Sequence, residues 1–172
     1  MGFRVGMTYD VKSQLPLRPE DPLDLNAEFD NDETINVIEQ AIRSANHEVL
    51  RIGNARQLLE RLSTRRREVD IVFNIAEGEE GRNRESQVPI LLEMMQIPYV
   101  GADGLTLGLT LDKVLTKKVL IAEGIPTPRF CEVHDPQALW QIPLAFPLIV
   151  KLRYEGSSKW VSDRSLINAP EE

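Results

Sequence analysis

The sequence predicts an α/β fold that begins with a parallel sheet, and three observations lead to this class. Short apolar runs near residues 3–9, 48–52, 70–75 and 98–101 alternate with segments of helical periodicity. The run at 70–75 is apolar without alternation, as in strands that are buried on both faces. Polar, glycine-bearing segments follow the strands, as expected for connections to crossover helices.

Composition fits a globular protein of the cytoplasm. Of the 172 residues, 42% are hydrophobic and 27% are charged, and the net charge of −7 argues against nucleic acid as a partner. No apolar run approaches the ~20 residues of a membrane span, so no membrane association is expected. Residues 1–4 lead directly into a strand pattern without a signal peptide. The single cysteine, Cys131, excludes an internal disulfide and fits a reducing compartment.

The N-terminal elements follow in order. A first strand covers residues 3–9, with Asp10 just past its end, and a proline-rich acidic segment at 11–31 is long enough to be a functional or mobile loop. Asp30 and Glu33 resemble a capping box, and the apolar spacing after them predicts a helix over 31–46. Asn54 is expected to cap a second helix, after a strand at 48–52.

The next elements place two acidic residues at one edge of the sheet. The strand at 70–75 is followed by a polar loop, and Ser86 opens a third helix before a short strand at 98–101. Ligands of parallel sheets bind beyond the carboxyl ends of the strands. Those ends carry Asp10 and Glu77, which suits an amine-bearing ligand. Solvent-facing loops would explain the same two residues equally well.

A change of pattern near residue 127 predicts a domain boundary. Residues 105–122 have helical periodicity with a break near 109–111, just before Lys113, and a glycine and a proline end this helix at 124–126. We therefore divide the chain into domains 1–127 and 128–172. A strand at 130–133 and a short helix at 136–141 are expected in the second. About 45 residues are too few to bury a core, so we expect a chain that is cut short.

A lysine and a glycine–serine turn stand out near the end. Residues 147–152 read as a buried strand interrupted by Lys151, residues 155–158 as a tight turn, and 159–161 as the returning strand. A buried ammonium needs a partner, and serine hydroxyls with backbone N–H groups can surround an anion. A phosphate clamp is one interpretation. Spacing alone slightly favours an ordinary hairpin with a snorkelling lysine.

Several stretches taken together resemble the D-alanine–D-alanine ligase-like branch of the ATP-grasp superfamily. They are VFNIAEG at 72–78, GAD at 101–103 with LDK at 111–113, GIPTP at 124–128, and VK at 150–151 with EGSS at 155–158. The match extends over nearly all of this chain but only about the first half of such a ligase. It implies a Rossmann-like pre-ATP-grasp domain followed by the opening of an ATP-grasp subdomain.

The resemblance implies an enzyme that forms an acyl phosphate from an amino acid carboxylate and ATP, which an amine then attacks. Lys113 and Lys151 would contact ATP, and Gly156, Ser157 and Ser158 would close over its phosphates. Ser157 would have a catalytic role, since it stands where the family orients substrate. Asp10 and Glu77 would bind substrate. Mg²⁺ is implied as well, with its ligands beyond this chain, and a homodimer stays open.

Three departures from the family pattern put D-alanine in question as the substrate and leave ATP use unaffected. Asp10 replaces the glutamate of the first turn, Glu77 stands in the place of a histidine, and Trp160 replaces a small residue after the loop. We expect this chain by itself to be inactive. The alternative is a stand-alone Rossmann-like module that binds an amino acid or a partner protein. A dinucleotide-dependent oxidoreductase is weaker, because no G-x-G-x-x-G follows the first strand.

Overall fold

The computed structural model describes residues 2–64, 68–135 and 142–169, and it divides into two compact units, Met1–Gly108 and Leu109–Glu172. The units part at residue 108, whereas the sequence places a domain boundary near 127. The helix over 113–122 therefore groups with the C-terminal unit. No helix in the described ranges is long and apolar enough to cross a membrane.

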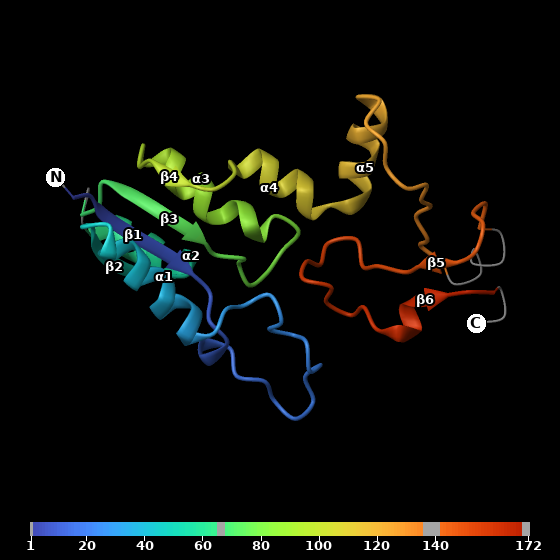
Figure 1. Cartoon of the computed structure of the whole chain (residues 1–172), viewed down its shortest axis with the longest axis horizontal. Coiled ribbons are helices and arrows are strands. Elements are labelled where there is room, and N and C mark those ends of the chain that lie inside the picture. Colours follow the sequence, from blue (N-terminus) through green and yellow to red (C-terminus); the bar gives the residue numbers. More distant parts are fainter. Residues whose placement is uncertain (1, 65–67, 136–141, 170–172) are drawn as a thin grey trace. The chain divides into compact units, whose positions relative to one another are not determined.

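A four-stranded parallel sheet forms the centre of the N-terminal unit (Figure 1). Its strands are β1 (Arg4–Tyr9), β2 (Glu48–Gly53), β3 (Ile71–Ile75) and β4 (Tyr99–Val100), in the order β2-β1-β3-β4. All three pairings are parallel, and Met7 lies opposite both Arg51 and Phe73. The predicted α/β class with a parallel sheet is confirmed. Because the strands share one direction, the residues that follow β1 and β3 emerge at the same edge.

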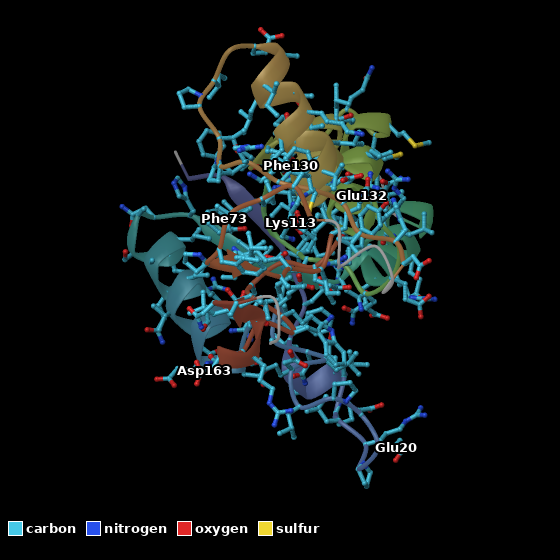
Figure 2. The ribbon with its side chains drawn as sticks, turned by 90° about the vertical axis from the view of Figure 1, so that its right-hand side faces the viewer. Glu20, Phe73, Lys113, Phe130, Glu132 and Asp163 are labelled. Atoms are coloured by element: carbon cyan, nitrogen blue, oxygen red, sulfur yellow. The ribbon has the colours of Figure 1, made fainter. Side chains whose placement is uncertain are left out.

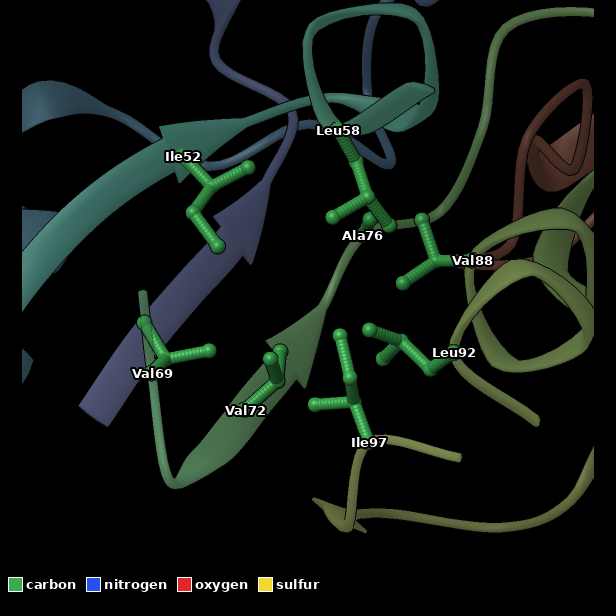
Figure 3. Close-up of a cluster of buried hydrophobic side chains, with 8 residues drawn as sticks. All are labelled: Ile52, Leu58, Val69, Val72, Ala76, Val88, Leu92 and Ile97. Atoms are coloured by element: carbon green, nitrogen blue, oxygen red, sulfur yellow. The ribbon is translucent and has the colours of Figure 1, made fainter. Parts of the chain in front are cut away.

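Helices cover both faces of this sheet. They are α1 (Asp32–Ser44), α2 (Ala55–Thr64) and α3 (Gln87–Met94), and a further helix, α4 (Gly104–Leu111), follows β4. One buried cluster joins α2 and α3 to the sheet through Leu58, Val72, Val88, Leu92 and their neighbours (Figure 3). A second cluster joins α1 to the opposite face through Met7, Tyr9, Val11 and Ile35. The consecutive residues Val72 and Phe73 contact different clusters, because successive side chains of a strand point to opposite faces of the sheet.

The predicted start of α1 is wrong by one residue. The N-cap is Asn31, whose Oδ1 accepts a hydrogen bond from the Thr34 N–H at 2.7 Å. Asp30 is held instead by the backbone, since its N–H donates to the Asp10 carbonyl and its carbonyl accepts from the Lys12 N–H. The long loop is thus closed at its base by a short parallel bridge, and the helix starts after it.

The predicted cap of α2 is confirmed. Asn54 Oδ1 accepts from the Gln57 N–H at 3.1 Å, and Gln57 Oε1 accepts from the Asn54 N–H at 2.9 Å. This reciprocal pair is the capping-box arrangement, which satisfies two N–H groups of the first turn. The sequence alone could indicate it, because both partners lie within one helical turn.

The C-terminal unit contains α5 (Lys113–Ala122) and a short antiparallel pair, β5 (Leu148–Ile149) with β6 (Leu166–Ile167). The predicted break before Lys113 is confirmed, since α4 ends at Leu111 and Asp112 caps α5. The predicted strand at 130–133 is wrong. Those residues have no regular secondary structure. The residues just before them are bound to α5 by Lys117, whose ammonium donates to Thr127 Oγ1 and the Pro128 carbonyl. The expected helix at 136–141 lies outside the described residues.

The predicted hairpin around the glycine–serine turn is also wrong. Leu148 and Ile149 pair with β6, not with residues 159–161, which lie in consecutive turns instead. The Lys159 N–H donates to the Gly156 carbonyl and the Val161 N–H to the Ser158 carbonyl, both at 2.9 Å. These local bonds use the groups that a returning strand would need for a ladder.

Candidate functional site

The structure brings Asp10 and Glu77 together at the carboxyl edge of the sheet, as expected. Asp10 follows β1 and is only 3% exposed. Its Oδ2 accepts hydrogen bonds from the N–H groups of Glu77, at 2.9 Å, and Gly78, at 2.8 Å. Asp10 therefore holds the start of the loop after β3, because it binds the backbone of Glu77 and Gly78.

Burial and like charge disturb the ionisation of both carboxyls. Desolvation raises the pKa of Asp10, against the lowering effect of its hydrogen bonds from the two N–H groups. Glu77 is affected more strongly, because burial, and then the nearby carboxylates of Glu85 and Glu28, raise its pKa to about 7. The Arg84 guanidinium opposes this rise. The Glu77 carboxyl is thus poised to change charge near neutral pH.

A buried ion pair that the sequence analysis missed supports the same edge. Arg84 Nη2 donates to both carboxylate oxygens of Glu28, at 2.8 and 2.9 Å, and the two side chains are 6% and 3% exposed. Glu28 lies in the long proline-rich loop and Arg84 in the polar loop after β3, 56 residues further on. Neither loop has a periodicity that indicates burial. The length of the first loop was the only signal of a special role.

Gly78 permits this arrangement because a side chain would not fit there. Its φ is +75°, in the left-handed region that disfavours residues with a Cβ. A Cβ at this position would lie 2.6 Å from the Arg84 carbonyl oxygen. The glycine lets the loop turn tightly enough for both N–H groups to reach Asp10.

The acidic edge as a whole suits a cationic ligand. The carboxyls of Glu85, Glu28 and Asp10 lie near enough to Glu77 to raise its pKa, and one guanidinium, that of Arg84, opposes them. Ionised carboxylates only accept hydrogen bonds, so an ammonium group is a complementary ligand. A bound cation would also lower the pKa of Glu77 by favouring its ionised form.

The glycine–serine segment has an unusual backbone in the C-terminal unit. Ser157, Ser158 and Trp160 have φ values of 45°, 57° and 63°. Such left-handed conformations are costly for residues other than glycine and gather at ligand-binding sites. In the described part of the chain, the N–H and hydroxyl groups of Ser157 and Ser158 have no hydrogen-bond partner. These donors are available to an anion.

The two lysines expected to contact ATP differ in their surroundings. The Lys113 ammonium donates to the Glu155 carbonyl, directly before Gly156, so the structure places it at the glycine–serine segment. Lys113 can be located in Figure 2, where Phe130 and Glu132 of the same unit are labelled as well. Lys151 is exposed, and it has no ion pair or hydrogen bond with any described residue.

The expectation of a buried ammonium at Lys151 is wrong. Ile149 and Val150, just before it, are each 56% exposed, because the two-residue strand β5 pairs on one side only with β6. A solvated ammonium does not need a buried counter-ion. Its availability to a ligand therefore rests on exposure and not on burial.

Asp112 and Arg153 form an ion pair that the sequence analysis did not single out. Arg153 donates from Nε to Oδ1 and from Nη2 to Oδ2 of Asp112, each at 2.7 Å. Arg153 also contacts Glu132 through Nη1. These hydrogen bonds, with two from backbone N–H groups, lower the pKa of Asp112 to about 2. The partners are 41 residues apart, so only the fold reveals them.

Magnesium does not fit the residues described. No group of three or more His, Cys, Asp or Glu side chains within residues 2–64, 68–135 and 142–169 is arranged to hold a metal ion. At the acidic edge of the sheet, the Asp10 carboxylate already accepts from two N–H groups and the Glu28 carboxylate from a guanidinium. We therefore derive no metal-dependent step from this chain.

Sequence comparison relates the chain to curated ligases, although no family model matches it. It is 38% identical over 101 residues to a D-alanine–D-alanine ligase of Xylella fastidiosa, which covers 56% of this chain and 33% of that protein. It is 36% identical over 132 residues to the ligase of Moorella thermoacetica, covering 72% and 41%. An uncharacterised protein of Sinorhizobium fredii is 42% identical over 88 residues, covering 51% and 26%.

Solved structures show the same fold. A D-alanine–D-alanine ligase from Bacillus anthracis matches with a TM-score of 0.60 at 24% identity, covering 90% of this chain and 47% of that one. A structure of that enzyme complexed with ATP matches with a TM-score of 0.51 at 23% identity, covering 74% and 39%. This chain thus spans less than half the length of these relatives. By sequence and by fold, it is related to D-alanine–D-alanine ligases over part of their length, which confirms the resemblance that its motifs indicate.

Proposed function

We propose that this chain is the amine-binding and phosphate-binding part of an ATP-dependent ligase that joins a carboxylate to an amine. The identity of 38% over 101 residues to one ligase of this class supports the reaction type. The single observation that carries the nucleotide assignment is the glycine–serine segment, where Ser157 and Ser158 present N–H and hydroxyl donors without partners in the described part. A related ligase has been solved with ATP, which supports the choice of nucleotide.

The proposed reaction has two steps. A carboxylate oxygen of the first substrate attacks the γ-phosphorus of ATP, and ADP leaves with the electron pair of the broken P–O bond. The amine of the second substrate then attacks the acyl carbon, inorganic phosphate leaves, and the nitrogen loses a proton. Phosphoryl transfer of this kind is accelerated mainly by positioning and by positive donors around the transferring oxygens.

Two groups of residues would serve this reaction. Lys113, Lys151, Gly156 and Ser158 would bind the phosphates, and Ser157 would in addition orient the reacting substrate. The ammonium groups and the N–H groups supply positive charge where negative charge accumulates.

Asp10 and Glu77 would hold the amine of a substrate. Asp10 also orders the loop that carries Glu77, so the two carboxyls act as one unit. The departures at Asp10, Glu77 and Trp160 put D-alanine in question as the substrate and leave the two substrates open. We expect no ligase turnover from the 172-residue chain alone, because it matches only part of the length of the ligases.

Thermal denaturation in the presence of ligands tests this proposal. We expect ATP to raise the melting temperature of the wild-type chain, since a ligand that binds only the folded state stabilises it. The rise should be lost in Lys151→Ala and kept in Lys118→Ala, which removes an exposed lysine of α5 outside the proposed site. No rise with ATP at millimolar concentration in the wild type would contradict the nucleotide site.

A second candidate is a binding module without catalysis, and one observation favours it. The acidic edge is built entirely within the N-terminal unit, which also contains both hydrophobic clusters. Such a unit could bind an amine by itself. A melting temperature that rises with amino acids but not with ATP would support this module, whereas a rise with ATP supports the ligase part.

A further inference from the structure

One buried carboxylate connects the start of α5 to the segment that leads into the glycine–serine turn. Asp112 is 1% exposed and lies at the break between α4 and α5. Its Oδ1 accepts from the N–H groups of Val114, at 3.1 Å, and Leu115, at 3.0 Å, so it caps the helix. The same carboxylate accepts the two-point contact from Arg153. The side chain thus fixes two parts of the chain at once.

Lys113 lies at the centre of this connection. Its N–H donates to the Arg153 carbonyl at 3.1 Å, and its ammonium donates to the Glu155 carbonyl. On the other side of Arg153, Nη1 contacts Glu132. The Arg153 guanidinium also lies 4.9 Å from the centre of the Tyr154 ring. Arg153 is therefore held at its guanidinium and its carbonyl, and both holds fix the segment that precedes Gly156.

We propose that Asp112 and Arg153 are positioning residues of the nucleotide site, which hold the Lys113 ammonium against the start of the glycine–serine turn. The planar guanidinium contacts both carboxylate oxygens, so it fixes orientation as well as distance. A lysine at position 153 would keep the charge but not this two-point geometry. That Lys113 binds a nucleotide rests on the proposed function. That the pair positions Lys113 rests on the contacts described above.

The ionised state of Asp112 and Arg153 supports this role. The low pKa of Asp112 keeps its carboxylate ionised well below neutral pH, and the carboxylates beside Arg153 raise the pKa of the guanidinium further. The pair therefore stays charged at and well below neutral pH. Its geometry does not depend on the protonation of either partner near neutral pH.

The test measures the reactivity of Lys113 towards acetic anhydride at trace concentration, with Lys118 as an internal reference on the same helix. Peptide mass spectrometry gives both acylation rates in the folded chain without nucleotide. The variant is Arg153→Lys, which preserves charge. The matched control is Arg164→Lys, at an exposed position of the same unit. Asp112→Asn is the second variant, since asparagine still offers an oxygen to cap α5.

We expect acylation of Lys113 relative to Lys118 to rise by about threefold or more in Arg153→Lys and in Asp112→Asn, as is typical when coupled neighbours are separated. Arg164→Lys should match the wild type. An unchanged ratio in both variants would overturn the proposal. If the acylation rates of Lys113 and Lys118 both rise by the same factor, the ratio is likewise unchanged, and the pair would then only stabilise the fold.

A second arm separates this inference from the proposed function. ATP should slow acylation of Lys113 in the wild type and slow it less in Arg153→Lys. If ATP gives no protection in the wild type, the nucleotide site is wrong. The rates without nucleotide still decide whether the pair positions Lys113.

Discussion

Replacing Glu77 by glutamine should stabilise the chain at high pH and have no effect at low pH. Burial and the neighbouring carboxylates raise the pKa of this carboxyl from 4.5 to about 7, so its ionisation in the folded chain is opposed. One pKa unit corresponds to about 1.4 kcal/mol, which gives a penalty on the order of 3 kcal/mol once the group is fully ionised. Because Glu77 is only partly buried, we expect about 1 to 3 kcal/mol.

The sign of this effect follows from linkage. Below about pH 4.5 the carboxyl is protonated in both states, and glutamine should match the wild type. Between about pH 4.5 and 7 the folded state binds more protons than the unfolded state, so wild-type stability falls as the pH rises. Above that range the penalty is complete and constant. Glutamine is neutral throughout and should avoid it.

Urea denaturation from pH 4.5 to 8.5 measures the difference in the free energy of unfolding between Glu77→Gln and the wild type. The matched control is Glu80→Gln, which changes an exposed glutamate of the same loop. A difference that does not vary with pH, or a variant that is less stable than the wild type at pH 8, would refute the electrostatic description of the acidic edge.

Three further predictions concern residues that hold the N-terminal unit together, each measured by urea denaturation. Gly78→Ala should destabilise the chain by roughly 2 kcal/mol or more, because it adds a contact with a backbone carbonyl to the left-handed strain. A Cβ at position 81 would have no atom within 4 Å, so Gly81→Ala should cost only the strain of its left-handed backbone. Equal losses of stability in Gly78→Ala and Gly81→Ala would contradict the role of the contact at Gly78. Leu92→Ala should cost about 2 to 5 kcal/mol, since Leu92 is 0% exposed, and a loss under about 1 kcal/mol would contradict its packing. Arg84→Met should cost about 3 to 5 kcal/mol by removing the two hydrogen bonds that the buried Glu28 carboxylate accepts from Arg84, and most of that should return when Glu28 is also changed to Met. No recovery in the double variant would contradict the pairing.

The parallel sheet could be predicted from the sequence because each of its longer strands has its own pattern. The apolar run at β3 and the stripe of α1 each report burial within a single element. The cap of α2 is equally local, since Asn54 and Gln57 are three residues apart. The cap of α1 was misplaced because Asp30 is held by the backbone of a distant strand end, which no local pattern reveals.

The hairpin was wrong for a related reason. β5 and β6 are two residues each, too short for a period to be read, and the apolar pair at 160–161 offered a false partner. The consequence for the site is that Lys151 is solvated, whereas Lys113 and the glycine–serine segment are together. Ion pairs between partners 41 and 56 residues apart could not be found from the sequence, because they depend on how the elements pack.

We propose that the glycine–serine segment receives the phosphates of ATP, and the N–H signals of that segment test this directly. In a two-dimensional ¹⁵N–¹H spectrum of the labelled 19.5 kDa chain, ATP should shift the resonances of Ser157 and Ser158 most, followed by those near Lys113. Tripolyphosphate should reproduce these shifts, and adenosine should not. Shifts with ATP that leave Ser157 and Ser158 unchanged would contradict the account.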